Sequence, residues 1–313
     1  MNIYFDHVDF NSFAGPHWFG QKLAKELIKK GHKINVLAPF FKNPDIQLSF
    51  VEVFEKKEGI PLIQRLDGIW YNTKTEYEKM NEPIKKTYDI ADGVIFQSNF
   101  DRDFIFHHFG EREKYSIIHN GADVEYIRSI PAARGLESYI DVWGCASSWI
   151  GEPPDGGPRY IKRLDENIRY FQEHSGEKDV LCVAGSIGKI ENPDPSKVIF
   201  LGELKIDKLI SLYKRSTWMI HMALQDHCPN VVVDARVSGC KIVCASSGGT
   251  PEIAGSDATI IVDENKHGFD AYDYNVPTTL DFSKQFQGAH KDVNISMDYV
   301  ADQYLDFFGR LIK

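Results

Sequence analysis

Short apolar runs and amphipathic stretches alternate along the first part of the chain. The apolar runs predict strands, and they lie at residues 1–8, 33–40, 60–68, 92–99 and 115–121. Residues 19–32 carry apolar side chains on one face and lysines on the other, which predicts an amphipathic helix ended by Gly31. Another helix is expected from about Phe100. Strands that alternate with helices in this way indicate a doubly wound parallel sheet.

A second series of the same kind follows a less regular stretch at 122–140, and we expect the two series to be joined near residues 125–138. Its predicted strands lie at 141–147, 179–186, 197–202, 216–223 and 240–246, and its helices at 163–174 and 205–216. The 313 residues are enough for two domains. We therefore expect one α/β domain over 1–130 and another over 131–294. The last segment, 295–313, is expected to form a helix that packs back on the first domain.

The composition limits the classes of protein to which this chain can belong. A hydrophobic content of 42% with 26% charged residues is typical of a globular protein and excludes a disordered or fibrous chain. The net charge of −9 implies no broad basic surface, which argues against a nucleic-acid partner. The start lacks the pattern of a signal peptide and no apolar run approaches the roughly 20 residues of a membrane span, so we expect a cytoplasmic protein. The five cysteines form no C-x-x-C, which favours buried, reduced thiols.

The stretch DHCPNVVVDARVSGCKIVCASSGGTPEIAG, residues 226–255, carries the most informative chemistry. Its apolar VVVD favours a strand by residue preference, but Pro229 and Gly239 are typical of a helix start and stop. The preceding strand also needs a crossover before the next parallel strand. We therefore predict a helix over 229–238. Asp226 then lies at the carboxyl end of a strand, where ligands bind in open α/β sheets, and Asp234 lies one to two turns into the helix.

The following loop indicates an anion site. Gly248 and Gly249 allow close approach to the backbone, and Thr250 is predicted to cap a helix that begins at Pro251. Free N–H groups at a helix start bind phosphate. Two carboxylates beside a diphosphate cradle suit a sugar nucleotide.

These residues resemble the donor half of retaining, GT-B-fold glycosyltransferases of the group-1 or family-4 kind. That family has an acid, seven residues, a second acid, a small-Gly turn, a strand and a GGTPE-like loop, and all of these occur here in order. Further similar stretches are PLIQRLDGIWYN, DGVIFQSNFDRD, IIHNGADVEYI and KVIFLGELKIDKLISLYKRSTWMIHMAL. The resemblance implies two Rossmann-like doubly wound domains that face each other across a cleft.

The resemblance also implies roles for individual residues. Three would serve catalysis: Asp226 near the donor sugar, Lys162 at the diphosphate, and Asp67 after the third predicted strand, where many relatives have histidine. The others would bind the donor nucleotide, with Asp234 at the ribose; they are Asp234, Gly248, Gly249, Gly202, Leu204, Gly15 and Arg163. Two departures stand out. Both acids are aspartates rather than glutamates, and the arginine that usually precedes the lysine is replaced by Arg159 or Arg163.

The predicted activity is therefore transfer of a sugar from a nucleotide-diphosphate donor to a hydroxyl-bearing acceptor, with retention and without a metal or other cofactor. Two alternatives remain: a sugar-nucleotide epimerase of related fold, and a non-catalytic nucleotide- or glycan-binding module. Single residues also allow plainer interpretations. Asp226 and Asp234 could be surface acids, Gly248–Gly249 a simple turn, and Lys162 a solvated lysine. His7 and His17 flank the predicted cleft, whereas His119 is expected to fix a turn.

Two motifs receive structural interpretations. Asp101–Asp103 resembles a D-x-D metal motif, but acids are also favoured at helix starts, and we predict the second. A lysine face could contact an anionic membrane; we predict that it is solvated instead, and it comprises Lys22, Lys25, Lys29, Lys30 and Lys33.

Overall fold

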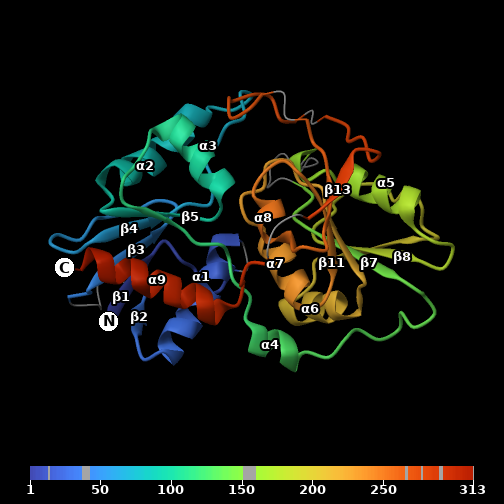
Figure 1. The fold of residues 1–313 in the computed structure, drawn as a ribbon, viewed down its shortest axis with the longest axis horizontal. Coiled ribbons are helices and arrows are strands. Elements are labelled where there is room, and N and C mark those ends of the chain that lie inside the picture. The colour runs from blue at the N-terminus through green and yellow to red at the C-terminus, as the bar shows by residue number, and fades with distance from the viewer. Residues whose placement is uncertain are drawn as a thin grey trace.

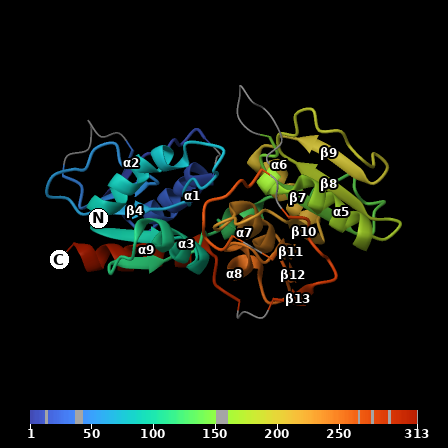
Figure 2. The same ribbon diagram turned by 90° about the horizontal axis from the view of Figure 1, so that it is seen from above.

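The computed structural model describes residues 1–12, 15–36, 43–150, 160–264, 267–275, 278–288 and 292–312. Two α/β halves lie side by side, each built on its own sheet (Figure 1). Figure 2 shows the same arrangement from above. Among these residues, no helix has both the length and the apolar character needed to cross a bilayer.

The first half contains a six-stranded sheet in which every pairing is parallel. Its strand order is β2-β1-β3-β4-β5-β6, and the strands are β1 (Asn2–Asp6), β2 (Lys33–Asn35), β3 (Ile46–Phe50), β4 (Leu62–Arg65), β5 (Gly93–Phe96) and β6 (Tyr115–Ile117). The helices of this half are α1 (Gly15–Lys29), α2 (Tyr77–Ile90) and α3 (Asn99–Phe109). The last helix, α9 (Met297–Leu311), lies against α1, where Tyr304 and Phe308 join the same core as Phe19 and Leu23.

The second half contains a seven-stranded sheet of order β13-β12-β11-β10-β7-β8-β9. Its strands are β7 (Val142–Ala146), β8 (Val180–Ala184), β9 (Val198–Gly202), β10 (Trp218–His221), β11 (Lys241–Ala245), β12 (Thr259–Ile261) and β13 (Gln285–Gln287). Only the β12–β13 pairing is antiparallel among the pairings described. The helices are α4 (Val124–Ser129), α5 (Leu164–His174), α6 (Ile206–Arg215), α7 (Asn230–Val237) and α8 (Thr250–Ala254).

Most predicted elements are present, including helix α7, where the Pro229 and Gly239 signals prevail over the β-branched VVV. The sequence pattern does not predict β3, α2, α4, β12 or β13. Strand β3 shows no continuous apolar run because it contains Gln47 and Ser49, yet all five of its residues are buried. Gln47 is tolerated because its amide pairs with Asp6, the Glu55 carbonyl and the Lys57 N–H.

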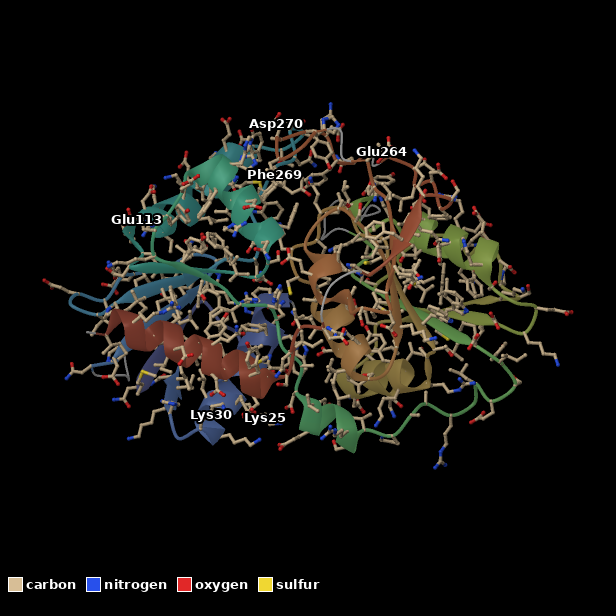
Figure 3. All side chains as sticks on the ribbon, in the orientation of Figure 1. Lys25, Lys30, Glu113, Glu264, Phe269 and Asp270 are labelled. Carbon is tan, nitrogen blue, oxygen red and sulfur yellow. The ribbon has the colours of Figure 1, made fainter. Side chains whose placement is uncertain are left out.

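Contacts between the halves close the molecule at several points. Residues 267–275 of the second half reach across to α3, where His107 pairs with Asp270 at 3.0 Å and His108 with the Phe269 carbonyl at 2.7 Å (Figure 3). All five cysteines are buried and free, as the sequence predicts.

Candidate functional site

Asp226 lies in the loop after β10, and its carboxylate faces two basic side chains. Its Oδ2 is 2.8 Å from Lys162 Nζ and 3.1 Å from His221 Nε2. Burial opposes ionisation of Asp226, but the Lys162 ammonium and the His221 ring outweigh it, so the pKa of the carboxyl lies well below its usual range. The structure thus brings Asp226 and Lys162 together as an ion pair. His221 was missed because a lone histidine inside a strand gives no signal beyond its place in the core.

Lys162 ends a short 3-10 turn, Tyr160–Lys162, and its side chain is 22% exposed. The ammonium is therefore oriented by Asp226, and the side chain is only partly buried. The next residue differs. Arg163 adopts a left-handed backbone (φ 49°) and its side chain is fully buried.

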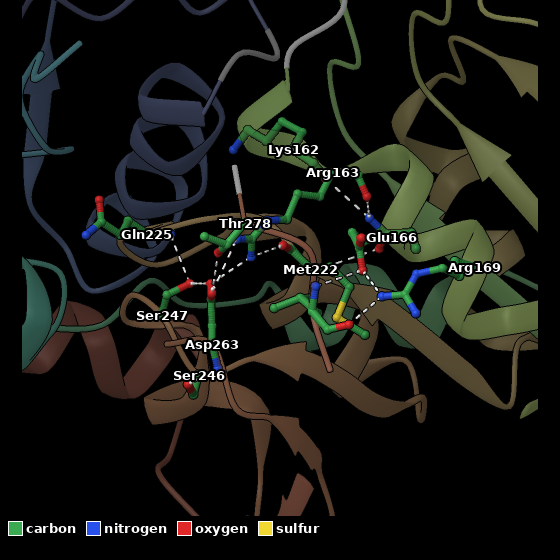
Figure 4. Close-up of polar contacts among 12 residues, drawn as sticks. Lys162, Arg163, Glu166, Arg169, Met222, Gln225, Ser246, Ser247, Asp263 and Thr278 are labelled. Carbon is green, nitrogen blue, oxygen red and sulfur yellow. Dashed lines mark hydrogen bonds and ion pairs between the residues drawn. The ribbon is translucent and has the colours of Figure 1, made fainter. Parts of the chain in front are cut away.

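The Arg163 guanidinium is held by one carboxylate (Figure 4). Its Nη1 and Nη2 lie 2.6 and 3.3 Å from the two oxygens of Asp263, and Nη2 also donates to Thr278 Oγ1 at 3.3 Å. Ser247 donates to the same Asp263 at 2.5 Å, so the pair fixes the loop before Gly248. A donor contact by Arg163 would require this buried pair to open. Arg159 lies outside the described residues.

Gly248 and Gly249 are packed against the acid loop. A Cβ at Gly248 (φ 96°) would lie 2.5 Å from the Asp226 carbonyl oxygen. A Cβ at Gly249 would lie 2.0 Å from the His227 oxygen and 2.4 Å from Ser98 Oγ of the first half. Both positions therefore require glycine for close approach of protein backbone, and their contact with a diphosphate stays a prediction.

Helix α8 begins one residue earlier than predicted. Gly249 is its N-cap and Thr250 its first residue, and no side chain caps it. The predicted Thr250 cap is therefore wrong. Among the described residues, the buried Thr250 Oγ1 finds no hydrogen-bond partner.

Glu252 links α8 to the first half. Its carboxylate accepts from the N–H groups of Asn99 and Phe100 at 2.9 and 3.0 Å, and from Asn99 Nδ2 at 2.8 Å. His119 Nε2 is 3.2 Å away. Burial raises the pKa of Glu252, but these hydrogen bonds outweigh it and lower the pKa to about 2. The acid of the GGTPE loop therefore neutralises the amino end of α3, a role that no local sequence pattern indicates.

Asp234 also contacts the first half. Its Oδ2 accepts from Trp18 Nε1 and its Oδ1 from Lys22 Nζ, both at 3.2 Å. The Lys22 side chain is only 2% exposed, so the prediction that it belongs to a solvated lysine face is wrong. It points into the interface between the halves.

The neighbouring lysines lie on the outside of the first half, and Figure 3 shows Lys25 and Lys30 there. Lys25 and Lys29 are 58% and 53% exposed, as a solvated face predicts. They pair with Asp123 and Glu125, and Lys30 pairs with Asp298 and Asp302 of α9. These acids neutralise most of the charge that an anionic surface would need.

Asp67 follows β4 in a buried polar cluster. Its Oδ1 accepts from Arg65 and Gln97, and Arg65 donates to Asn120 at 2.6 Å. Burial raises the pKa of Asp67, although the Arg65 charge opposes the shift. No contact joins Asp67 directly to Lys162 or Asp226 among the described residues.

His227 of the acid loop inserts beside this cluster. Its Nδ1 lies 2.8 Å from Asp101 Oδ1, and a Cβ at Gly68 (φ 96°) would lie 2.3 Å from its Nε2. Burial lowers the pKa of His227, but the Asp101 carboxylate outweighs it and the pKa is raised. Glycine at position 68 thus admits a histidine from the opposite half.

Asp101 has the structural role predicted for a helix start. Its N–H donates to Ser98 Oγ, the N-cap of α3, and its Oδ2 accepts from the Gln97 N–H. Within the described part of the chain, no three histidine, cysteine or acidic residues are grouped to hold a metal ion.

The remaining candidates lie at the edges of the site. Gly202 (φ 67°) ends β9, and Leu204 packs on the core of the second half. Gly15 begins α1, and its carbonyl accepts from Asn230 Nδ2 at 3.1 Å. Their nucleotide-binding roles stay predictions. His17 accepts from the Asp9 N–H, whereas His7, at a positive φ of 65°, stacks on the exposed ring of Phe54.

Comparison with known proteins shows the fold. No protein-family model matches the sequence, and no curated protein matches it. Three solved structures are similar over almost the whole chain. Anabaena HepE in complex with UDP and glucose has a TM-score of 0.65 at 13% identity and covers 99% of this chain and 100% of its own. Sucrose-phosphate synthase from Thermosynechococcus elongatus has a TM-score of 0.69 at 9% identity and covers 99% of this chain and 98% of its own. AviGT4, a glycosyltransferase involved in avilamycin A biosynthesis, has a TM-score of 0.62 at 14% identity and covers 99% of this chain and 98% of its own.

The chain therefore has the GT-B fold of these proteins, with two Rossmann-like halves. This fold was predicted from the motifs of residues 226–255 and their order along the chain.

Proposed function

We propose that the protein is a glycosyltransferase that uses a nucleotide-diphosphate sugar as donor. The observation that carries the proposal is the Lys162–Asp226 pair, 2.8 Å long, at the carboxyl ends of the second sheet and close to the first half. It occurs in a fold that this chain shares with HepE, which was solved with UDP and glucose. The two members of this pair are residues to which the resemblance assigns roles at the donor, which supports the proposal.

The pair suits departure of a diphosphate. In the proposed reaction the bond from the sugar C1 to the diphosphate oxygen breaks, and a bond from C1 to an acceptor oxygen forms. The acceptor hydroxyl proton leaves with the nucleoside diphosphate or to water. Negative charge grows on the leaving diphosphate, and a preorganised ammonium stabilises it without reorganisation. Asp226 holds Lys162 in place before the donor arrives.

We propose further that the configuration at C1 is retained and that no metal is needed, as the family resemblance implies. The Gly248 N–H would assist Lys162 at the diphosphate, since the Gly249 N–H already donates to the Asp226 carbonyl at 2.8 Å. The first half would bind the acceptor. There, Asp67 is the carboxyl candidate that the resemblance implies, and burial raises its pKa although the Arg65 charge opposes the shift.

The test is hydrolysis and transfer measured with UDP-glucose, GDP-mannose and ADP-glucose. Lys162→Ala should lower the rate for the accepted donor about 10²–10³-fold, the range found when one preorganised donor group is removed. Asp226→Asn should lower it too, because Lys162 loses its orientation. Lys208→Ala, an exposed lysine on α6, is the matched control and should have no effect.

Equal rates for Lys162→Ala and wild type would contradict the proposed role. Epimerised free donor without transfer would favour the epimerase. Absence of any turnover with intact nucleotide binding would favour the non-catalytic module.

A further inference from the structure

Two helices from opposite halves meet at the acid assigned to the donor ribose. Helix α1 presents Trp18 and Lys22, four residues apart, and α7 presents Asn230 and Asp234, also four residues apart. Residues at this spacing lie on the same helix face, so the two pairs face each other. Four polar contacts join the helices. Trp18 and Lys22 donate to Asp234 at 3.2 Å each, Lys22 donates to Asn230 Oδ1 at 3.2 Å, and Asn230 donates to the Gly15 carbonyl at 3.1 Å.

These contacts leave Asp234 little capacity for a ligand. Each carboxylate oxygen already accepts from α1, one from the indole and one from the ammonium. The side chains of Asp234 and Lys22 are only 5% and 2% exposed. A ribose needs the same carboxylate oxygens for its two hydroxyl groups, and it needs space beside them. Trp18 and Lys22 use one acceptor site on each oxygen, and the near-complete burial of Asp234 and Lys22 leaves no room for a ribose beside them.

We propose that Trp18 and Lys22 form a latch that competes with the donor ribose for Asp234. The proposal rests on the proposed function, which places the ribose at this acid. The donor then enters only after α1 withdraws from α7, so that donor binding is coupled to separation of the halves. Lys22 and Trp18 would thereby set the nucleotide affinity without contacting the bound donor.

The charge balance explains how such a latch can be released. A buried ion pair offsets much of its attraction by the loss of water around both charges, so opening it to solvent changes the free energy little. Removing only the cation has a different effect. Asp234 would then be buried without its charge partner in the closed arrangement, which favours opening. Loss of Lys22 should therefore strengthen nucleotide binding.

Calorimetric titration with UDP, GDP and ADP tests the latch. If the wild-type latch is closed about nine-tenths of the time, its apparent affinity is lowered about tenfold, and Lys22→Met should recover that factor. Trp18→Phe removes one hydrogen bond to Asp234 and keeps the ring, so a smaller gain is expected. Lys30→Met is the control, because Lys30 follows the same helix and its ion pairs reach only α9. Circular dichroism melting checks that each variant is folded.

A second readout does not depend on nucleotide. Small-angle scattering without nucleotide should show a larger radius of gyration for Lys22→Met than for wild type. Unchanged or weaker binding by Lys22→Met, while the wild type binds, would overturn the latch and leave the donor site standing. Weaker binding would identify Lys22 as a ligand of the donor. If no diphosphate binds either protein, both proposals fail.

Discussion

Glu252 is predicted to contribute measurably to the stability of the closed arrangement, and Glu252→Gln tests this. Its carboxylate accepts from two backbone N–H groups at the start of α3 and from Asn99 Nδ2, and it lies beside His119. The glutamine keeps the shape but loses the charge and one acceptor. The change therefore removes the negative charge from the helix end while the size of the side chain stays the same.

The expected loss of stability follows from the pKa shift of Glu252. Burial opposes ionisation, but the hydrogen bonds from His119, Asn99 and Phe100 lower the pKa of Glu252 from its ordinary 4.5 to about 2. A fall of that size corresponds to about 3 kcal/mol. The side chain is 21% exposed, and solvent screens it, so we expect about 1–2 kcal/mol at pH 7.

The direction of the pKa shift of Glu252 determines how its contribution to stability depends on pH. A carboxyl whose pKa is lower in the folded state stabilises the fold above the pKa of the unfolded chain. That stabilisation is lost as the pH falls from about 4.5 to about 2. The difference between wild type and Glu252→Gln should therefore be full at pH 7, smaller at pH 3.5, and close to zero near pH 2.

The assay is urea unfolding at several pH values, followed by tryptophan fluorescence. Glu264→Gln is the control, since the Glu264 side chain is 62% exposed and pairs with Lys284 within the second half. A destabilisation below about 0.5 kcal/mol at pH 7, or one that is independent of pH, would refute the reasoning.

Two further predictions concern the interface. Gly249→Ala should lower the free energy of unfolding by about 2–4 kcal/mol in urea titrations, because its Cβ would collide with the His227 carbonyl oxygen and Ser98 Oγ. At Gly15 the new Cβ would meet no described atom within 4 Å, so Gly15→Ala should be neutral; equal effects of the two would contradict the packing. The pKa of His227 is raised in the folded state, because the Asp101 carboxylate outweighs the effect of burial. The pair therefore stabilises the fold fully below the pKa of His227 in the unfolded chain. That stabilisation is lost as the pH rises through the pKa of His227 in the folded state. His227→Gln should thus destabilise the protein more at pH 6 than at pH 9, and the opposite trend would contradict the pairing.

The fold was predictable because its signals are local. The alternation of apolar and amphipathic segments indicates α/β halves, and Pro229 with Gly239 places α7 within one residue at each end. Strand β3 was missed because Gln47 interrupts its apolar pattern, and the loop carbonyl and N–H groups that satisfy Gln47 are known only once the chain is folded.

The site was predictable only in part, for a physical reason. Lys162 and Asp226 belong to one half, and their meeting follows from the strand order of that half. Lys22, Glu252 and His227 have partners in the opposite half. The orientation of one half against the other depends on all the surfaces between them, so no local pattern could show that a lysine in an amphipathic helix would be buried.

The central claim is that this site binds a nucleoside diphosphate without a metal. Calorimetric titration of UDP, GDP and ADP into wild type and Asp234→Ala, with and without EDTA, tests it most directly. We predict micromolar binding of one diphosphate, unchanged by EDTA and lost in Asp234→Ala. Failure of all three to bind the wild type, or equal binding by Asp234→Ala, would contradict the account.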